Sequence, residues 1–274
     1  MKTLYVSDLD KTLLRDDQTI SDFSKNTIEE LMSDGMIFTY ATARSASTAK
    51  AATCGLKIPY AIVYNGAFIV DTQSGEQILS SAFEKCESEK LINELLENGA
   101  YPRVFSMIEG KERFTYTPEH LESLGAKEYF RTRKNDPRAR LGGVEDLFLG
   151  EIFLISCCGE KDKLSPLYDK LKESCICHFY PDSYSPDHYL ELLPKGATKA
   201  SAVLRLKEHL GCDKVVAFGD AVNDISMFEI ADECYAVSNA CDELKAIATA
   251  VIPSNEEDGV AKWLSENKDI ATCL

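Results

Sequence analysis

The sequence predicts an α/β protein whose core is a parallel β-sheet and whose middle forms a second, inserted α/β domain. Short apolar runs alternate with helical patterns over the first 80 residues, and the same alternation returns near the C-terminus. The middle of the chain shows a different pattern of expected strands and helices, and a chain of 274 residues is long enough for two modest domains. We therefore expect 1–82 and 191–274 to form the core and 83–190 to form the insertion.

The first 80 residues predict a βαβαβ order. The expected strands are "TLYVSD" (3–8), "MIFTYAT" (36–42) and "YAIVYNGAFIVD" (60–71), and the expected helices are "SDFSKNTIEELMSDG" (21–35) and "TAKAATCGL" (48–56). Ser21 is a suitable N-cap for the first helix, and Gly35 lies just past its end. This order is typical of a parallel sheet with helical crossovers.

The C-terminal part continues the same sheet. "TKASAVLRLKEHLG" predicts a helix that ends at Gly211, followed by a strand at "KVVAFGD", a helix at "NDISMFEIA", strands at "YAVS" and "TAVIP", and a last helix around Trp263. In the middle, a helix is expected near 87–98, and two alternating runs around Glu109-Gly110 predict an antiparallel hairpin. Further strands are expected at "EIFLISCC", "CICHFY" and "HYLELLPK", with a helix in "EKDKLSPLYDKLKE".

The composition disfavours several classes of protein. Asp and Glu number 45 against 30 Lys and Arg, and the formal net charge of −15 opposes attraction to nucleic acids or anionic membranes. No stretch approaches the roughly 18 consecutive apolar residues of a membrane span, and no signal-peptide pattern precedes the first strand. We expect a cytoplasmic protein with no nucleic acid or membrane partner. Composition leaves its oligomeric state undetermined.

The ten cysteines are expected to be reduced, because they are scattered through a long chain without a secretory signal. Cys157-Cys158 and the pair Cys175 and Cys177 lie in apolar runs and match no standard zinc spacing. Buried cysteines that pack as small apolar side chains are the favoured interpretation.

Polar residues follow the expected core strands, at the edge where parallel α/β sheets bind ligands. These residues are Asp8 and Asp10, Thr42, Asn65 and Gly66, and the segment "GDAVND" (219–224). Each has a simple structural explanation as a turn or cap residue. Together they would concentrate several carboxylates on one edge, which is costly without a cation. Carboxylates on rigid strand ends suit Mg²⁺, and Lys199 could bring an ammonium group to the same edge.

These features resemble the haloacid dehalogenase superfamily of phosphohydrolases, and within it the Cof-type group. The four motifs of that superfamily resemble "DLDKTLL" (8–14), "ATAR" (41–44), "GATKASAV" (196–203) and "GDAVND" (219–224), in the same order. The insertion occupies the position of the cap domain of that group, which supplies substrate specificity. Two departures are Lys11 and Ala43, which stand where the group often has glycine. The resemblance implies a Rossmann-like catalytic core.

The resemblance also implies a role for individual residues. Asp8 would be the nucleophile that forms an aspartyl-phosphate, and Asp10 the general acid and base. Since residues i and i+2 of an extended segment share a side, both could face one phosphate. Mg²⁺ would be bound by Asp8, the backbone carbonyl of Asp10, Asp220 and Asp224. Phosphate would be bound by the backbone at Leu9 and Ala43 and by Thr42, Lys199 and Asn223. Asn65 and Gly66 are possible substrate contacts, although a structural turn explains them equally well.

Other basic residues carry weaker predictions. Arg44 follows Thr42 directly, but a helix cap or a surface ion pair is favoured over phosphate binding. In the cap, Arg113 and Arg131, together with 133–134, could meet an anionic substrate, although a solvated face is the favoured interpretation of each.

The implied function is hydrolysis of small phosphorylated metabolites, such as sugar phosphates, by a Mg²⁺-dependent phosphatase. A phosphomutase of the same superfamily would use the same Asp pair and stays open as an alternative, as does a non-catalytic phosphate-binding protein on this scaffold. A response-regulator-like module is disfavoured, because its phospho-acceptor Asp would follow a later strand and its chain would be about half as long.

Overall fold

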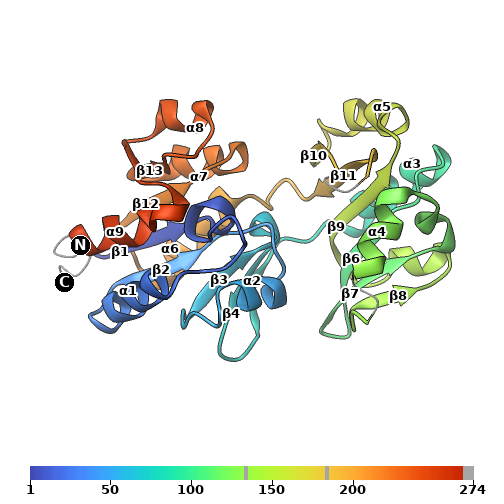
Figure 1. The fold of residues 1–274 in the computed structure, drawn as a ribbon. Coiled ribbons are helices and arrows are strands. Elements are labelled where there is room, and N and C mark those ends of the chain that lie inside the picture. The colour runs from blue at the N-terminus through green and yellow to red at the C-terminus, as the bar shows by residue number, and fades with distance from the viewer. Residues whose placement is uncertain (133–134, 183–184, 268–274) are drawn as a thin grey trace. The chain divides into compact units, whose positions relative to one another are not determined.

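The computed structural model describes residues 1–132, 135–182 and 185–267 and divides the chain into two units. The core unit contains 1–80 and 197–274, and the cap unit contains 81–196. The N-terminal and C-terminal segments, blue and red in Figure 1, both belong to the core, while the green and yellow middle forms the cap. The prediction of a mixed α/β protein with a parallel-sheet core and a separate inserted unit is confirmed.

The junction at which the chain returns from the cap to the core differs from the predicted one. The predicted boundary at residue 190 falls inside a strand that belongs wholly to the cap. β11 (His188–Leu193) pairs antiparallel with β10 (Ile176–Pro181) on one side and β9 (Glu151–Gly159) on the other. The junction therefore follows Gly196 rather than residue 190. With the predicted boundary, Glu191, Leu192 and Leu193 of this central strand would lie outside the sheet that they complete.

The core sheet has five parallel strands in the order β14-β13-β12-β1-β2. They are β1 (Thr3–Ser7), β2 (Ile37–Tyr40), β12 (Lys214–Gly219), β13 (Glu233–Val237) and β14 (Ala250–Ile252). Ser7 is in register with both Tyr40 and Phe218. The carboxyl ends of β1, β2 and β12 are thus level, so residues that follow these three strands emerge at one edge.

Helices and turns complete the core. The helices are α1 (Asp22–Ser33), α2 (Ala46–Ala52), α6 (Lys199–Leu210), α7 (Ile225–Ile230), α8 (Asp242–Ile247) and α9 (Gly259–Glu266), and the short turns are η1 (Leu9–Leu13), η5 (Val222–Asp224) and η6 (Asn255–Glu257). The predicted caps are confirmed: the Ser21 hydroxyl accepts the N–H of Ser24 at 2.9 Å, and Gly211 ends α6 with a φ of 62°.

The aromatic side chain of Trp263 packs α9 against the sheet. Its ring lies 4.3 Å from that of Tyr235 and 5.3 Å from that of Phe218, and Tyr5 lies 6.5 Å away. Phe218 and Tyr5 are on the neighbouring strands β12 and β1, and both are buried. Large aromatic contacts of this kind contribute strongly to core stability.

The segment 60–71 was predicted as one strand, and that prediction is wrong. It forms β3 (Tyr60–Val63) and β4 (Phe68–Asp71), which pair antiparallel and are separated by the turn η2 (Tyr64–Gly66). Tyr64, Asn65 and Gly66 have φ values of 50°, 53° and 100°, and this left-handed run reverses the chain. β5 (Gln77–Ser80) pairs with β4, and a bridge from Ala41 to Ile62 joins β3 to the end of β2.

The cap unit contains a six-stranded sheet in the order β10-β11-β9-β6-β7-β8. Its other elements are α3 (Lys85–Glu97), β6 (Arg103–Ile108), β7 (Lys111–Tyr116), η3 (Pro118–Glu122), α4 (Leu124–Thr132), β8 (Ala139–Leu141), η4 (Val144–Phe148) and α5 (Lys161–Leu171). The predicted hairpin is confirmed, with Glu109 and Gly110 both left-handed at its two-residue turn. The elements between residues 118 and 148 were not predicted.

The two faces of the cap sheet differ in chemistry. One face buries an apolar cluster with α3 and α5 that includes Cys157 and Cys175, as expected for cysteines that pack as small apolar side chains. On β6, Arg103 is only 4% exposed, and its guanidinium lies 3.7 Å from the ring centroid of Tyr129. A cation on an aromatic face is stabilised by the ring quadrupole.

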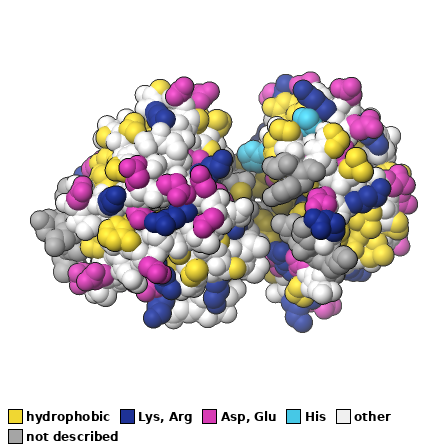
Figure 2. Space-filling view, in the orientation of Figure 1, with side chains coloured by type: hydrophobic (Ala, Val, Ile, Leu, Met, Phe, Trp, Pro, Cys, Tyr) yellow, Lys and Arg dark blue, Asp and Glu magenta, His cyan; other side chains and the backbone are white. Residues whose placement is uncertain are grey.

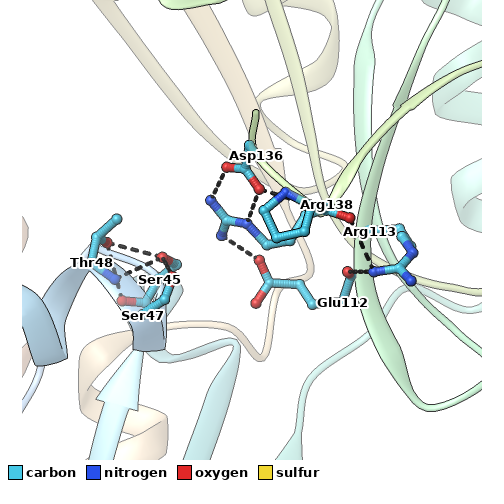
Figure 3. Close-up of polar contacts among 8 residues, drawn as sticks. Ser45, Ser47, Thr48, Glu112, Arg113, Asp136 and Arg138 are labelled. Atoms are coloured by element: carbon cyan, nitrogen blue, oxygen red, sulfur yellow. Dashed lines mark hydrogen bonds and ion pairs between the residues drawn. The ribbon is translucent and has the colours of Figure 1, made fainter. Parts of the chain in front are cut away.

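A charged network at the edge of the cap sheet is visible in Figure 3. Arg138 pairs with Asp136 at 2.7 Å and with Glu112 at 2.6 Å, and Arg113 donates to the carbonyl oxygen of Glu112 at 3.1 Å.

In the helices that the structure describes, no segment is both long and apolar enough to cross a membrane.

Substitution of Gly211 tests the end of α6. Gly211→Ala should lower the free energy of unfolding by roughly 1–2 kcal/mol, because the left-handed conformation strains a Cβ even though space around Gly211 is open. Gly211→Asn is the matched control and should lose less, since asparagine tolerates this conformation. Chemical denaturation monitored by circular dichroism measures both. Equal stability of the alanine variant and the parent would contradict the argument.

Candidate active site at the strand ends of the core

Two carboxylates meet where adjacent strands end. Asp8 follows β1 and Asp220 follows β12, and the N–H of Asp8 donates to the carbonyl oxygen of Phe218 at 2.9 Å. Asp8 is 5% exposed, and Asp220 is half-buried and accepts a hydrogen bond from the Thr12 hydroxyl at 3.0 Å. The parallel register therefore brings together residues that are more than 200 positions apart in the chain.

A third carboxylate, that of Asp224, is fixed by its own loop. Its Oδ2 atom accepts the backbone N–H groups of Asp220 at 3.0 Å and Ala221 at 3.1 Å. A Cβ on Gly219 would lie 2.7 Å from Oδ2 of Asp224, so glycine is needed for the loop to close this tightly. The Asp224 side chain is fully buried.

Lys199 places an ammonium group among these carboxylates. It is the first residue of α6, whose N-cap Thr198 accepts the N–H of Ser201 at 3.0 Å. The Lys199 side chain is 1% exposed, and its Nζ donates to Oδ1 of Asp224 at 2.7 Å and to Oδ1 of Asp8. Such a buried lysine is tolerated only because it is paired.

The cluster fits a divalent cation. Ligand oxygens of Asp8, Asp220 and Asp224 all lie within 4.8 Å of one another, and hard carboxylate oxygens are the donors that Mg²⁺ prefers. With one ammonium against three carboxylates, the ionised cluster keeps a charge of −2. Burial and the neighbouring carboxylates raise the pKa of Asp8 to about 8 and that of Asp220 to about 6, against the effect of Lys199. The single ammonium group of Lys199 therefore does not neutralise the three carboxylates, and a bound cation would offset the remaining negative charge.

Candidate phosphate-binding groups lie around this cluster. Thr42 follows β2 and is fully buried, and its hydroxyl oxygen accepts the N–H of Arg44 at 3.1 Å, which leaves the hydroxyl proton for another acceptor. Leu9 is buried, whereas Ala43 and Asn223 are exposed. Ala43 lies outside the left-handed region, so an alanine fits there without strain. Lys11 has a φ of 58°, which explains why glycine suits that position.

Comparison with known proteins decides the family. The model of the haloacid dehalogenase-like hydrolases matches residues 5–264. The chain belongs to this hydrolase family. Its sequence is 30% identical over 282 residues to a 5-amino-6-(5-phospho-D-ribitylamino)uracil phosphatase of Bacillus subtilis, covering 94% of this chain and 96% of the relative.

Solved structures agree with the fold of this haloacid dehalogenase-like hydrolase. A crystal structure from Thermotoga maritima has a TM-score of 0.77 at 24% identity and covers 97% of both chains. A structure described as a sugar phosphatase of subclass IIB of this superfamily has a TM-score of 0.72 at 21% identity, covering 97% of this chain and 98% of the other. The predicted superfamily and the predicted class of phosphoric monoester hydrolase are confirmed.

In this hydrolase, Gly66 has a packing role beside the cluster. An added Cβ would overlap the backbone carbonyl of Thr198, the residue directly before Lys199. The turn η2 thus fits against the N-terminus of α6 only because Gly66 has no side chain. Asn65 has a φ of 53°, and its buried Oδ1 atom has no partner among the described residues. Substrate contact by either residue stays a prediction.

The second carboxylate of the first motif lies apart from the other three. The Asp10 side chain is 46% exposed, and Arg44 pairs with it at 2.5 Å. Arg44 forms an ion pair, as expected, but the expectation of a surface pair is wrong, since its side chain is only 19% exposed. Its partner is a predicted catalytic residue, which the sequence did not indicate. The sequence assigned only the backbone carbonyl of Asp10 to the predicted Mg²⁺ site. Pairing of the Asp10 carboxylate with Arg44 leaves that prediction unchanged.

The basic cap residues named from the sequence have local partners. Arg131 pairs with Glu128 at 2.6 Å on the exposed face of α4, and Arg113 donates to backbone carbonyls of Glu112 and Pro137. The remaining two, at 133–134, lie outside the described residues. The buried Arg103 was not singled out, because nothing in its sequence context distinguishes it from exposed arginines.

Substitution of Gly66 tests the packing of η2 on α6. Gly66→Ala should lower the free energy of unfolding by more than about 1 kcal/mol and weaken phosphate binding, because the overlap displaces Lys199. Gly75→Ala is the matched control, since Gly75 has a similar φ of 76° but open space around it. Thermal unfolding and titration with inorganic phosphate measure the two effects. Equal losses in both variants would show that backbone strain, not the contact with Thr198, is responsible.

The raised pKa values of Asp8 and Asp220 predict how the effect of Mg²⁺ on stability changes with pH. Above about pH 4 the unfolded state releases protons that the metal-free folded state keeps, on Asp220 up to about pH 6 and on Asp8 up to about pH 8, so the free energy of unfolding falls as pH rises through this range. A cation competes with these protons. The increase in melting temperature caused by MgCl₂ over EDTA should therefore grow from about pH 5 to about pH 8, by about 3 °C for each kcal/mol. Asp34→Asn, at an exposed helix end, should leave this trend unchanged, whereas a pH-independent Mg²⁺ effect would contradict it.

Proposed function

We propose that the protein is a Mg²⁺-dependent phosphatase that hydrolyses small phosphomonoesters, such as sugar phosphates, through an aspartyl-phosphate. The observation that carries the proposal is the buried carboxylate of Asp8, held by Lys199 beside Asp220 and Asp224. An anionic nucleophile attacks an anionic phosphate only where positive charge offsets the repulsion. A lysine and a divalent cation supply that charge.

The reaction has two steps, with Asp8 and Asp10 in different roles. In the first, an Asp8 oxygen bonds to phosphorus while the bond from phosphorus to the leaving oxygen breaks, and Asp10 gives that oxygen a proton. In the second, water attacks phosphorus, Asp10 takes a proton from it, and the bond from phosphorus to Asp8 breaks. Phosphate leaves, and both carboxylates return to their starting state.

The remaining residues bind and orient the phosphoryl group. Lys199 and the Thr42 hydroxyl would donate to its oxygens, together with Asn223 and the backbone N–H groups at Leu9 and Ala43. Fixed donors of this kind stabilise a phosphoryl transition state mainly by electrostatics and positioning. Asp8, the backbone carbonyl of Asp10, Asp220 and Asp224 would hold Mg²⁺. When bound, the ion supplies positive charge that neutralises the transferring phosphoryl group.

The relatives support a small-molecule substrate. The Bacillus subtilis relative is a phosphatase of a phosphorylated ribitylaminouracil, and the fold neighbour of subclass IIB is a sugar phosphatase. On the face that Figure 2 shows, Lys and Arg side chains lie among Asp and Glu side chains, and the net charge is −15. A small phosphorylated metabolite in the cytoplasm, rather than a nucleic acid, fits these observations.

Replacement of the nucleophile tests the proposal. Asp8→Asn should lower phosphate release from p-nitrophenyl phosphate and sugar phosphates at least about 1,000-fold, because an amide cannot form the phosphoenzyme. EDTA should abolish turnover by the parent, and Mg²⁺ should restore it. Steady-state phosphate release measures all three, with Asp34→Asn as the control for an exposed Asp.

Two outcomes would contradict the proposal. If a folded parent protein released no phosphate from any compound of a broad panel, the hydrolase function would be wrong. If it instead moved the phosphoryl group within a sugar phosphate and released no inorganic phosphate, the phosphomutase alternative would replace it. Nuclear magnetic resonance of phosphorus separates these products directly.

A further inference from the structure

Arg44 holds the carboxylate of Asp10 at two points. Its Nη2 donates to Oδ1 of Asp10 at 2.5 Å, and its Nε donates to Oδ2 at 2.9 Å. A parallel pair of hydrogen bonds fixes both the position and the rotation of a carboxylate, which a single contact cannot do. The pair lies within the core unit, so its geometry depends on that unit alone.

The arginine is itself fixed from several sides. Its backbone N–H donates to the hydroxyl of Thr42 at 3.1 Å, and its carbonyl oxygen accepts the N–H of Tyr64 at 3.0 Å. Its Nη2 also donates to Oε1 of Gln18 at 2.9 Å. The side chain is only 19% exposed. Arg44 is thus a rigid support rather than a mobile surface residue.

Ser45, the next residue, anchors the same segment. Its hydroxyl is the N-cap of α2 and accepts the N–H of Thr48 at 3.3 Å. Figure 3 shows this helix start and the contacts of the Ser45 hydroxyl with those of Ser47 and Thr48. A capped helix start restrains the backbone that precedes it. Arg44 therefore lies between a fixed strand end and a fixed helix start.

The pairing leaves Asp10 able to exchange a proton. Each carboxylate oxygen has two lone-pair positions. Oδ1 of Asp10 accepts from Nη2 at 2.5 Å and from the shared Nε at 3.2 Å, whereas Oδ2 accepts only from Nε at 2.9 Å and so keeps one position for a proton. The Asp10 side chain remains 46% exposed, in contrast to the buried Asp8. A substrate oxygen can therefore approach Asp10 while Arg44 keeps its contacts.

We propose that Arg44 is a positioning residue, which acts through Asp10 by holding its carboxyl group for proton exchange with the leaving-group oxygen. This proposal rests on the proposed function of Asp10 as general acid and base. Direct phosphate binding by Arg44 is disfavoured, because its Nε and Nη2 atoms already have acceptors in Asp10 and Gln18. The two roles predict different kinetics.

Substrates with different leaving groups separate these roles. p-Nitrophenolate is a weak base that leaves without a proton, whereas the alkoxide of a sugar or glycerol needs one. Arg44→Met should lower the rate of phosphoenzyme formation, measured by rapid quench, about 10-fold to 100-fold for the alkyl phosphates and leave it nearly unchanged for p-nitrophenyl phosphate. Hydrolysis of the phosphoenzyme also uses Asp10 and should slow equally for both substrates. KM should change little for both substrates.

Two further variants grade the effect. Arg44→Lys keeps one charged contact with Asp10 and should recover part of the loss on alkyl phosphates. Gln18→Leu removes a contact of Arg44 without touching Asp10 and should cause a smaller loss of the same kind. Arg15→Met is the matched control, since Arg15 forms an ion pair with Asp258 at 3.1 Å elsewhere in the core. It should affect both substrates equally or not at all.

Each other outcome overturns the proposal. Equal slowing of phosphoenzyme formation on both substrates with a raised KM would assign Arg44 to phosphate binding, and a rise in kcat would mean that Arg44 holds Asp10 away from the reaction. Unchanged kinetics would make the pair a surface contact. A melting temperature equal to that of the parent shows that Arg44→Met is folded. A parent protein without phosphatase activity would refute the proposed function itself, which distinguishes that failure from a failure of this proposal.

Discussion

The active-site edge depends on the balance of buried charge between Lys199 and the carboxylates of Asp8 and Asp224. Burial of an ion costs several kcal/mol unless its partners compensate, and removal of one partner leaves the others without compensation. The lysine contacts both carboxylates, so neither strand end nor α6 can shift without breaking this set. The arrangement still has an excess of negative charge, and that excess is what a divalent cation would satisfy. The balance of charge that stabilises the edge would therefore also set its affinity for a metal ion.

The fold produces this balance by bringing distant segments of the chain to one edge. Parallel strands β1 and β12 deliver Asp8 and Asp220, and a tight loop after Gly219 brings Asp224 beneath them. Gly66 lets a turn from a third segment pack against the residue before Lys199. Both glycines are needed because another part of the chain occupies the space of a side chain. The backbone geometry at these two glycines therefore helps to place the charged side chains.

Much of this arrangement could be predicted from the sequence, because strands and their following residues leave a local pattern. Periodicity and caps alone predict strand ends at Asp8, Thr42 and 219–224 and a helix start at Lys199. Contacts that depend on three dimensions could not be predicted. The pairing of Arg44 with Asp10 joins two segments through side-chain rotamers. Asn65 and Gly66 had a turn as one explanation, but the apolar residues on both sides did not show that the chain reverses there into a second, antiparallel strand. In the cap, the predicted junction at residue 190 cut through β11, since only pairing with β9 and β10 shows that the whole strand belongs to the cap sheet.

The spacing of Asp8 and Asp10 is best understood from their different surroundings. The backbone is extended at both residues, and the intervening Leu9 is buried, which anchors the segment in the core. Asp8 lies among charges in a buried cluster, where a nucleophile benefits from fixed dipoles and exclusion of water. Asp10 is half-exposed beside an arginine, where a group that exchanges protons with substrate and water must be reachable. The different roles proposed for two carboxylates of identical chemistry thus rest on a single intervening residue, which separates a buried environment from an accessible one.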